Sequence, residues 1–97
     1  MITLGFVCGI SGAVTLDTPF TDGNGVAITS TYIVIPTTGT EGGIVYYNSN
    51  GNPMWLPYAT LGYNPIAATR IVTTATVDGI IRTTTATPLA WMGSYKG

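Results

Sequence analysis

Histidine is absent from this sequence, and charged side chains are scarce. The 97 residues include three basic and four acidic side chains, which give a net charge of −1. Histidine is the commonest general base and metal ligand, so a serine or cysteine nucleophile would lack its usual partner. Three basic residues are also too few to form the positive stripe that binds nucleic-acid phosphates. These absences argue against an enzyme and against a direct nucleic-acid partner.

Cysteine occurs only once, so no disulfide can form within the chain. The apolar segment around it, GFVCGIS, indicates that Cys8 is a small core residue. A lipid-attachment cysteine or a reactive thiol is the alternative, although no basic segment precedes Cys8 and no histidine is present to activate its thiol. We find no signal peptide in the sequence. We therefore expect the protein to stay in the cytoplasm where it is made, or to leave it as part of an assembly.

Long apolar segments are missing as well. The longest uncharged segment, residues 42–69, is interrupted by asparagine, proline and glycine, whereas a membrane-spanning helix needs about twenty predominantly apolar residues. The segment has instead the composition of β-hairpins. We expect no membrane partner.

What the chain contains in place of charge is threonine, glycine and tyrosine. Glycine occurs 13 times and tyrosine 6 times, while charged residues make up 7% of the sequence. Threonine and tyrosine favour strands, and glycine favours turns. We predict a single all-β domain over residues 1–97. So neutral a surface gives little repulsion between copies, which favours a homo-oligomer or attachment to a larger assembly over a free monomer.

Turn-forming residues divide the chain into short segments rich in valine, isoleucine, threonine and tyrosine. This spacing is typical of a small antiparallel β-sandwich or a jelly-roll-like barrel with almost no helix. The turn clusters lie at residues 17–25, 36–43, 48–53, 61–65, 78–79 and 87–88.

The clearest strand covers residues 26–35. Both faces of this segment are apolar near its end, so we expect the strand to be covered on both sides there. Strict alternation places on one face Val26, Ile28, Tyr32 and Val34, and on the other Ala27, Ile33 and Ile35.

A hairpin is predicted between residues 43–47 and 54–58. The two segments flank Asn50 and Gly51, which both tolerate positive φ. Pro57 has no amide hydrogen to donate, so the second arm is expected at a sheet edge or at a strand end.

A second hairpin is predicted to turn at Asp78 and Gly79. Neither of its faces is a clean apolar stripe. The pair therefore either completes its burial against a neighbouring sheet or chain, or forms a solvated threonine-rich sheet. The register that follows from the turn pairs Val77 with Ile80, Thr74 with Thr83 and Thr73 with Thr84.

All four carboxylates, Asp17, Asp22, Glu41 and Asp78, lie in turn-like segments, where an aspartate usually bonds to its own backbone. We predict no catalytic residues, no metal and no cofactor. A weak calcium site built from Asp17, Asp22 and Asn24 is the one alternative, although it lacks the spacing and the closing glutamate of a calcium loop.

Aromatic and arginine side chains are the candidates for contacts with partners. Large rings that keep a polar tip satisfied usually fill the core or anchor an interface, and we favour these roles over a sugar-binding platform. We expect each arginine to contact a carboxylate, its own or a neighbour's. The predicted interface residues are Tyr46, Tyr47, Trp55, Tyr58, Tyr63, Arg70, Arg82 and Trp91.

Three segments, TYIVIPTTGTEGGIVYYNSNGN, NPIAATRIV and RTTTATPLAWMGSY, resemble in their order the head-spike-base family of gene transfer agents and related phages. The resemblance covers roughly residues 26 to 95 as a succession of motifs. Residues 73–82 look like an insertion, and residues 1–12 have no counterpart in the family. The matching positions are Tyr32 to Pro36, Gly39 to Tyr47, Gly51, Pro65 with Ile66, and Thr84 to Trp91.

The resemblance implies a non-enzymatic virion structural protein without a cofactor. Such a protein is made in the host cytoplasm, self-associates and binds the major capsid protein or other virion proteins on the capsid surface, as a decoration protein or as the base of a head spike or fibre. The alternative is a tail- or fibre-associated adhesin, a carbohydrate-binding β domain that would use Trp55 and Tyr58.

Overall fold

A computed structural model of the chain describes residues 10–87 and 89–95, so the predicted core position of Cys8 lies outside the described residues. These residues form antiparallel strands joined by turns and contain no helix, which confirms the all-β prediction. They therefore include no long apolar helix of the kind that crosses a membrane. The strands are β1 (Ile10–Ala13), β2 (Ile28–Ile35), β3 (Gly42–Tyr47), β4 (Pro53–Ala59), β5 (Gly62–Asn64), β6 (Arg70–Val72), β7 (Thr74–Val77), β8 (Ile80–Thr83) and β9 (Ala90–Tyr95).

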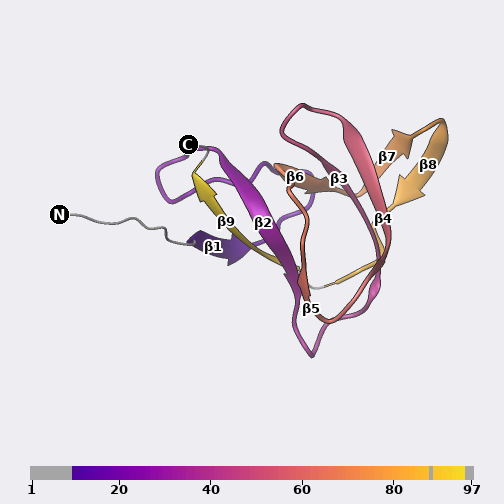
Figure 1. The fold of residues 1–97 in the computed structure, drawn as a ribbon, viewed down its shortest axis with the longest axis horizontal. Helices are drawn as coiled ribbons and strands as arrows, with labels where there is room; N and C mark the ends of the chain where they lie inside the picture. The colour runs from indigo at the N-terminus through magenta and orange to yellow at the C-terminus, as the bar shows by residue number, and fades with distance from the viewer. Residues whose placement is uncertain (1–9, 88, 96–97) are drawn as a thin grey trace.

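The strands make two sheets and a separate hairpin. The four-stranded sheet has the order β1-β9-β2-β5, the three-stranded sheet has the order β4-β3-β6, and β7 pairs with β8. The hairpin β7–β8 lies at the end of the molecule opposite to β1 (Figure 1). The predicted sandwich is thus present, with the hairpin added to its outside.

The main core lies between the two sheets. Ile33 and Trp91 face inward from the four-stranded sheet, and Ile44 and Ile71 face inward from the three-stranded sheet. The three isoleucines are fully buried. Because burying each such side chain contributes about 1.5–3 kcal/mol, this layer is the principal source of stability.

A second, smaller core lies on the other side of the three-stranded sheet. Val45 of β3 and Val72 of β6 pack there against Val77 of the hairpin. Ile44 and Val45 are neighbours in β3 and point to opposite faces, yet both are completely buried. The hairpin therefore buries Val77 against a neighbouring sheet of the same chain, which agrees with one of the two alternatives the sequence left open, while Ile80 and Ile81 stay exposed.

The strand β2 contains a bulge that strict alternation does not predict. The pairing of β2 with β9 shifts register between Ser30 and Tyr32. One extra residue reverses the faces of everything that follows, so Ile28 and Ile33 are both buried while Tyr32 and Val34 point outward. The predicted separation of Ile28 from Ile33 is wrong for this reason. At the end of the strand Ile35 is fully buried and Val34 is half-buried, so the cover expected on the second face is incomplete within the chain.

The hairpin turn at Asp78 and Gly79 agrees with the sequence prediction. Both residues have positive φ, 52° and 82°, as a two-residue type I′ turn requires. Val77 pairs with Ile80, and Thr74 pairs with Thr83.

The hairpin β3–β4 forms where it was predicted, with a longer turn. Asn48 donates its amide to the carbonyl of Asn52, and the Asn48 side chain accepts hydrogen bonds from the amides of Asn50 and Asn52. Of the predicted pair, only Gly51 adopts a positive φ. Pro57 lies in β4, which is an edge strand of the three-stranded sheet as the sequence predicts.

Candidate interaction surfaces

One face of the four-stranded sheet is turned away from the main core, and we call it the outer face. Tyr32 and Tyr63 are its largest side chains, 40% and 65% exposed. Their ring centroids are 5.6 Å apart, with the rings tilted by 51°. The strand registers place no charged residue on this face, which consists of Ser11, Ala13, Tyr32, Val34, Tyr63, Ala90 and Met92. The outer face is therefore an uncharged surface with a tyrosine pair at one side.

Asn64 holds the short edge strand that carries Tyr63. Its side-chain amide donates to the carbonyls of Ile33, Thr60 and Gly62, and its side-chain oxygen accepts a hydrogen bond from the amide of Thr60. Asn64 is buried on the inner side of β5. Because successive side chains alternate between faces, Tyr63 must point outward.

A cavity of about 440 Å³ lies between the hairpin and the beginning of β4. We call it the hairpin pocket. Ile80 belongs to its lining and is still 52% exposed. The lining residues are Pro53, Met54, Trp55, Val77, Asp78, Ile80 and Arg82. The pocket therefore combines apolar walls with one acidic and one basic side chain.

Arg82 is held in this pocket by an aromatic ring. Its guanidinium carbon lies 5.2 Å from the centroid of the Trp55 ring, which is a cation–π contact. The Nε atom of Arg82 is shielded from solvent and has no hydrogen-bond acceptor among the described residues. A buried donor without an acceptor is costly, so this group favours an occupant that brings an acceptor.

Within the part of the chain that the structure describes, neither arginine forms an ion pair with a carboxylate of its own chain, and a contact with a carboxylate of a neighbouring molecule stays a prediction. Arg70 lies 4.4 Å from the centroid of the Tyr47 ring, its cross-strand partner, and Arg82 lies over Trp55. The charge of Arg70 nevertheless helps to lower the pKa of Asp17, although less than the hydrogen bonds from Thr73 do. Rings rather than carboxylates hold both guanidinium groups.

Asp17 and Asp22 both fix loops, but in different ways. The Asp17 carboxylate accepts hydrogen bonds from the hydroxyl and the amide of Thr73, and these bonds are the main reason that its pKa is below the ordinary value. Asp22 accepts hydrogen bonds from the amides of Asn24 and Val26, which is the predicted turn role. Among the described residues, no cluster of three or more acidic, cysteine or histidine side chains forms a metal site.

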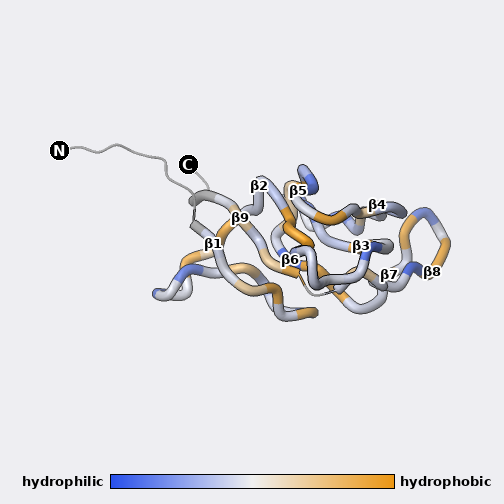
Figure 2. The backbone as a smooth tube through the Cα atoms, turned by 90° about the horizontal axis from the view of Figure 1, so that it is seen from below, coloured by the Kyte–Doolittle hydropathy of each residue, from blue (hydrophilic) through white to orange (hydrophobic). Residues whose placement is uncertain are grey.

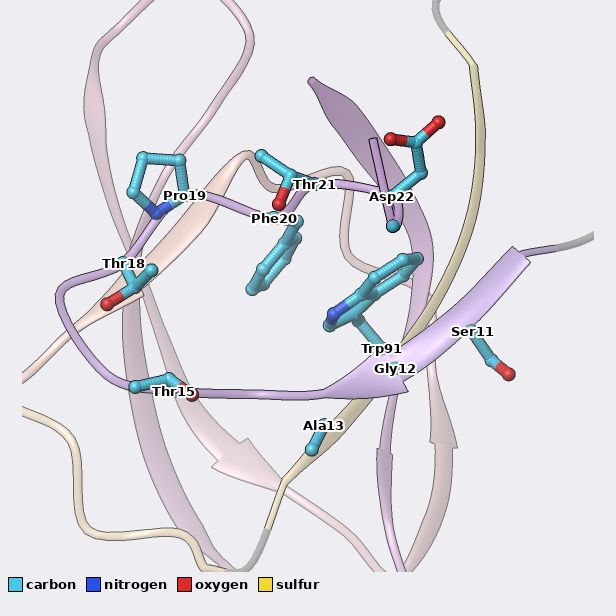
Figure 3. Close-up of a pocket in the computed structure, with 11 residues that line it drawn as sticks. Ser11, Gly12, Ala13, Thr15, Thr18, Pro19, Phe20, Thr21, Asp22 and Trp91 are labelled. Atoms are coloured by element: carbon cyan, nitrogen blue, oxygen red, sulfur yellow. The ribbon is translucent and has the colours of Figure 1, made fainter. Parts of the chain in front are cut away.

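A second cavity, of about 350 Å³, opens beside Phe20 and Trp91. The two rings are stacked, with centroids 5.6 Å apart and an interplanar angle of 17°. Figure 3 shows the rings together in the middle of the view, with the Asp22 side chain turned away from them. Both rings are almost completely buried, so they act as core residues and do not offer a stacking platform.

The eight predicted interface residues do not form one surface. Tyr63 belongs to the outer face, and Tyr58 is 84% exposed on β4 of the other sheet. Trp55 and Arg82 line the hairpin pocket, and Tyr47 pairs with Arg70. Tyr46 packs against the main core, where burial raises the pKa of its hydroxyl, and Trp91 lies inside that core.

Sequence reasoning missed Tyr32 and Ile80. Tyr32 was assigned to the face of Ile28, and only the bulge in β2 turns it outward. Ile80 follows the predicted Asp78-Gly79 turn directly, so an apolar side chain at a hairpin tip was the available indication.

Comparison of the chain with known protein families, with curated proteins and with solved structures found no match.

Proposed function

We propose that this protein is a non-enzymatic structural component of a phage virion that binds the capsid surface through its outer face. The observation that supports this proposal most directly is the uncharged, open face of the four-stranded sheet, with Tyr32 and Tyr63 at its side. An apolar sheet face of this kind gains stability when a partner covers it. The partner is the major capsid protein or another virion protein.

The chemistry of the described residues supports adhesion over catalysis. Asp17 and Asp22 bond to the backbone of separate loops, and Trp55 and Trp91 pack in two different cores. The large exposed side chains of the outer face are instead those of Tyr32 and Tyr63. Covering one such large apolar side chain contributes about 1.5–3 kcal/mol, so these groups supply the affinity. The order of motifs over residues 26 to 95, which resembles that of head-spike-base proteins, is the support for the capsid as the site of attachment.

The test is binding to capsid shells that lack this protein. Tyr32→Lys and Tyr63→Lys place a charge on the outer face, and burying an unpaired charge at an interface is costly. Each variant should bind shells at least tenfold more weakly in a co-sedimentation assay, which corresponds to about 1.4 kcal/mol or more. Tyr58→Lys is the matched control, because it makes the same change at an exposed tyrosine of the other sheet.

The proposal fails if the wild-type protein does not bind such shells. It also fails if Tyr58→Lys weakens binding as much as the two outer-face variants do.

A carbohydrate-binding adhesin is the second candidate, and the exposed Tyr32–Tyr63 pair is the observation that favours it. Two rings tilted against each other can hold the apolar face of a sugar. The pair is a better platform than Trp55, since Arg82 lies over the Trp55 ring. Retention of the wild-type protein on a glycan array, lost in Tyr63→Ala and kept in Tyr58→Ala, would establish this function in place of shell binding.

A further inference from the structure

The hairpin pocket contains an acid and a base that do not satisfy each other. Asp78 and Arg82 both line it, yet no ion pair joins them within the described residues. The Arg82 guanidinium rests on Trp55 instead, and its Nε atom is buried without an acceptor. An arginine in this state favours a carboxylate, which accepts two parallel hydrogen bonds from the guanidinium.

If a second copy of the chain supplies the carboxylate that accepts hydrogen bonds from Arg82, few of its acidic side chains are available for this contact. Asp17 is bonded to Thr73, Asp22 is bonded to the amides of its own turn, and Glu41 accepts a hydrogen bond from the amide of Leu61. Among the described residues, Asp78 is the carboxylate for which no hydrogen bond or ion pair is found. Within the described part of the chain, the carboxylate of Asp78 and the guanidinium with the unpaired Nε atom thus line the same pocket.

The position of the pocket allows two copies to meet there. The hairpin lies at the far end of the molecule, and Figure 2 shows an apolar stretch beside its hydrophilic turn. Ile80 faces the pocket and is 52% exposed, while Ile81 points to the other face of the hairpin. A partner that covers Ile80 therefore approaches Asp78 and Arg82 from the same side.

We propose that two copies of the chain associate hairpin to hairpin about a twofold axis, with Asp78 of each copy paired to Arg82 of the other. In a twofold interface every contact occurs twice, once in each direction. Asp78 of the first copy therefore pairs with Arg82 of the second, and Asp78 of the second copy pairs with Arg82 of the first. Ile80 of each copy covers the apolar wall of the opposite pocket. This inference goes beyond the proposed function, because it concerns association between copies and uses a different surface from the one that binds the shell.

The proposal is tested by mixing two charge-reversed variants, Asp78→Arg and Arg82→Asp. Each variant alone places like charges opposite each other in both contacts and should sediment as a monomer. An equal mixture restores an opposite pair at both contacts and should sediment as a dimer. A contact within one chain cannot be restored by mixing, so this result separates the twofold interface from an intramolecular role of the two residues.

If charge reversal at the half-buried Arg82 unfolds the chain, the dimer can be tested with more conservative substitutions. Asp78→Asn keeps a side chain that tolerates positive φ, and it should weaken dimerisation at least tenfold. Ile80→Thr should weaken it as well, while Ile81→Thr, the matched change on the other face of the hairpin, should leave it unchanged. Added salt should weaken the wild-type dimer, since it screens the two ion pairs.

A wild-type chain that remains monomeric at every soluble concentration would overturn the inference, as would folded charge-reversed variants that stay monomeric when mixed. An equal loss in Ile80→Thr and Ile81→Thr would also overturn it. Shell binding reports separately on the proposed function: Asp78→Asn should still bind shells through its intact outer face. A dimer that does not bind shells leaves the hairpin interface standing and refutes the shell-binding proposal.

Discussion

Asn64 shows how one buried polar side chain fixes a surface feature. Its amide group serves three carbonyls of two separate segments, and its oxygen accepts the amide of Thr60. Removing it leaves the buried carbonyl of Ile33 without this donor and takes away the hydrogen bonds that shape residues 60–62; a buried polar group without a partner typically costs about 1–3 kcal/mol. Asn64 therefore sets both the stability of β5 and the position of Tyr63.

Replacing Asn64 by alanine should lower the free energy of unfolding by about 1–3 kcal/mol, measured by urea denaturation. Asn52→Ala is the control, because the exposed Asn52 side chain makes no hydrogen bond among the described contacts. It should change stability by less than about 0.5 kcal/mol. Equal effects of the two substitutions would contradict the role assigned to Asn64.

Asp17 gives the stability of the protein a dependence on pH. The hydroxyl and the amide of Thr73 hold the pKa of Asp17 below its ordinary value of 3.8. A carboxyl whose pKa is lower in the folded state binds fewer protons there, so it stabilises the fold above the unfolded pKa. That contribution is lost as the pH falls through the folded pKa.

Asp17→Asn should therefore be less stable than the wild type at neutral pH, and the difference should shrink towards zero as the pH falls below 3.8. Asparagine is the suitable replacement because it tolerates the positive φ of 65° at this position. Urea denaturation of both proteins across this pH range measures the effect. In a Thr73→Val background the same substitution should have a smaller effect, and an undiminished effect there would exclude Thr73 as the cause.

At the scale of elements, the sequence predicts a strand pair well where a local turn decides it. Asp78 and Gly79 fix a type I′ turn, and the register of β7 with β8 follows from it. Alternation failed in β2, because no sequence pattern announces the extra residue between Ser30 and Tyr32. The bulge forms where β2 pairs with β9, a strand that is distant in the sequence. Tertiary pairing, and not the local sequence, therefore decides that Tyr32 reaches the surface.

The candidate surfaces were harder to predict from the sequence than the strand pairs, because they also depend on tertiary contacts. Tyr63 and Tyr58 could be identified as exposed aromatic residues from their turn-rich segment, and both are exposed. The aromatic partners of the two arginines could not be identified from the sequence. Tyr47 comes close to Arg70 only through strand pairing, and Trp55 comes close to Arg82 only through the packing of the hairpin on the sheet. The small number of carboxylates in the sequence did not identify the aromatic rings that hold the two arginines instead.

Gly43 determines how closely β4 and the hairpin pack on the centre of the sheet. A Cβ atom at this position would overlap the ring of Trp55, the residue on which Arg82 rests. Glycine is needed there because the ring occupies the space of a side chain. The contact between β3 and Trp55 therefore depends on the absence of one methyl group.

Gly43→Ala should lower the free energy of unfolding by about 1–3 kcal/mol, the usual cost of overpacking. It should also change the fluorescence of Trp55, which has to move. Gly23→Ala is the matched control, since a Cβ atom at Gly23 meets nothing within 4 Å, and it should be neutral within about 0.5 kcal/mol. Equal denaturation midpoints for the two variants would contradict this account of Gly43.

The whole molecule is a stack of three layers, and β3 lies at its centre. Ile44 points into the main core and Val45 into the second core, so β3 connects the sandwich to the hairpin. Among residues 10–87 and 89–95, three buried side chains form the second core, fewer than form the main core. Opening the hairpin exposes less apolar surface than separating the sheets, so the hairpin is the least stable layer.

The two tryptophans report on the two cores separately, because Trp91 lies in the main core and Trp55 packs against the second one. In Trp91→Phe the remaining signal follows the hairpin layer, and in Trp55→Phe it follows the sandwich. Val77→Ala should shift the urea midpoint of the Trp55 signal more than that of the Trp91 signal. Ile44→Ala should cost about 2–5 kcal/mol and shift both midpoints together, because the hairpin has no sheet to pack on once the sandwich unfolds. If Val77→Ala shifts both signals equally, the hairpin and the sandwich unfold as one unit, and the layers do not differ in stability.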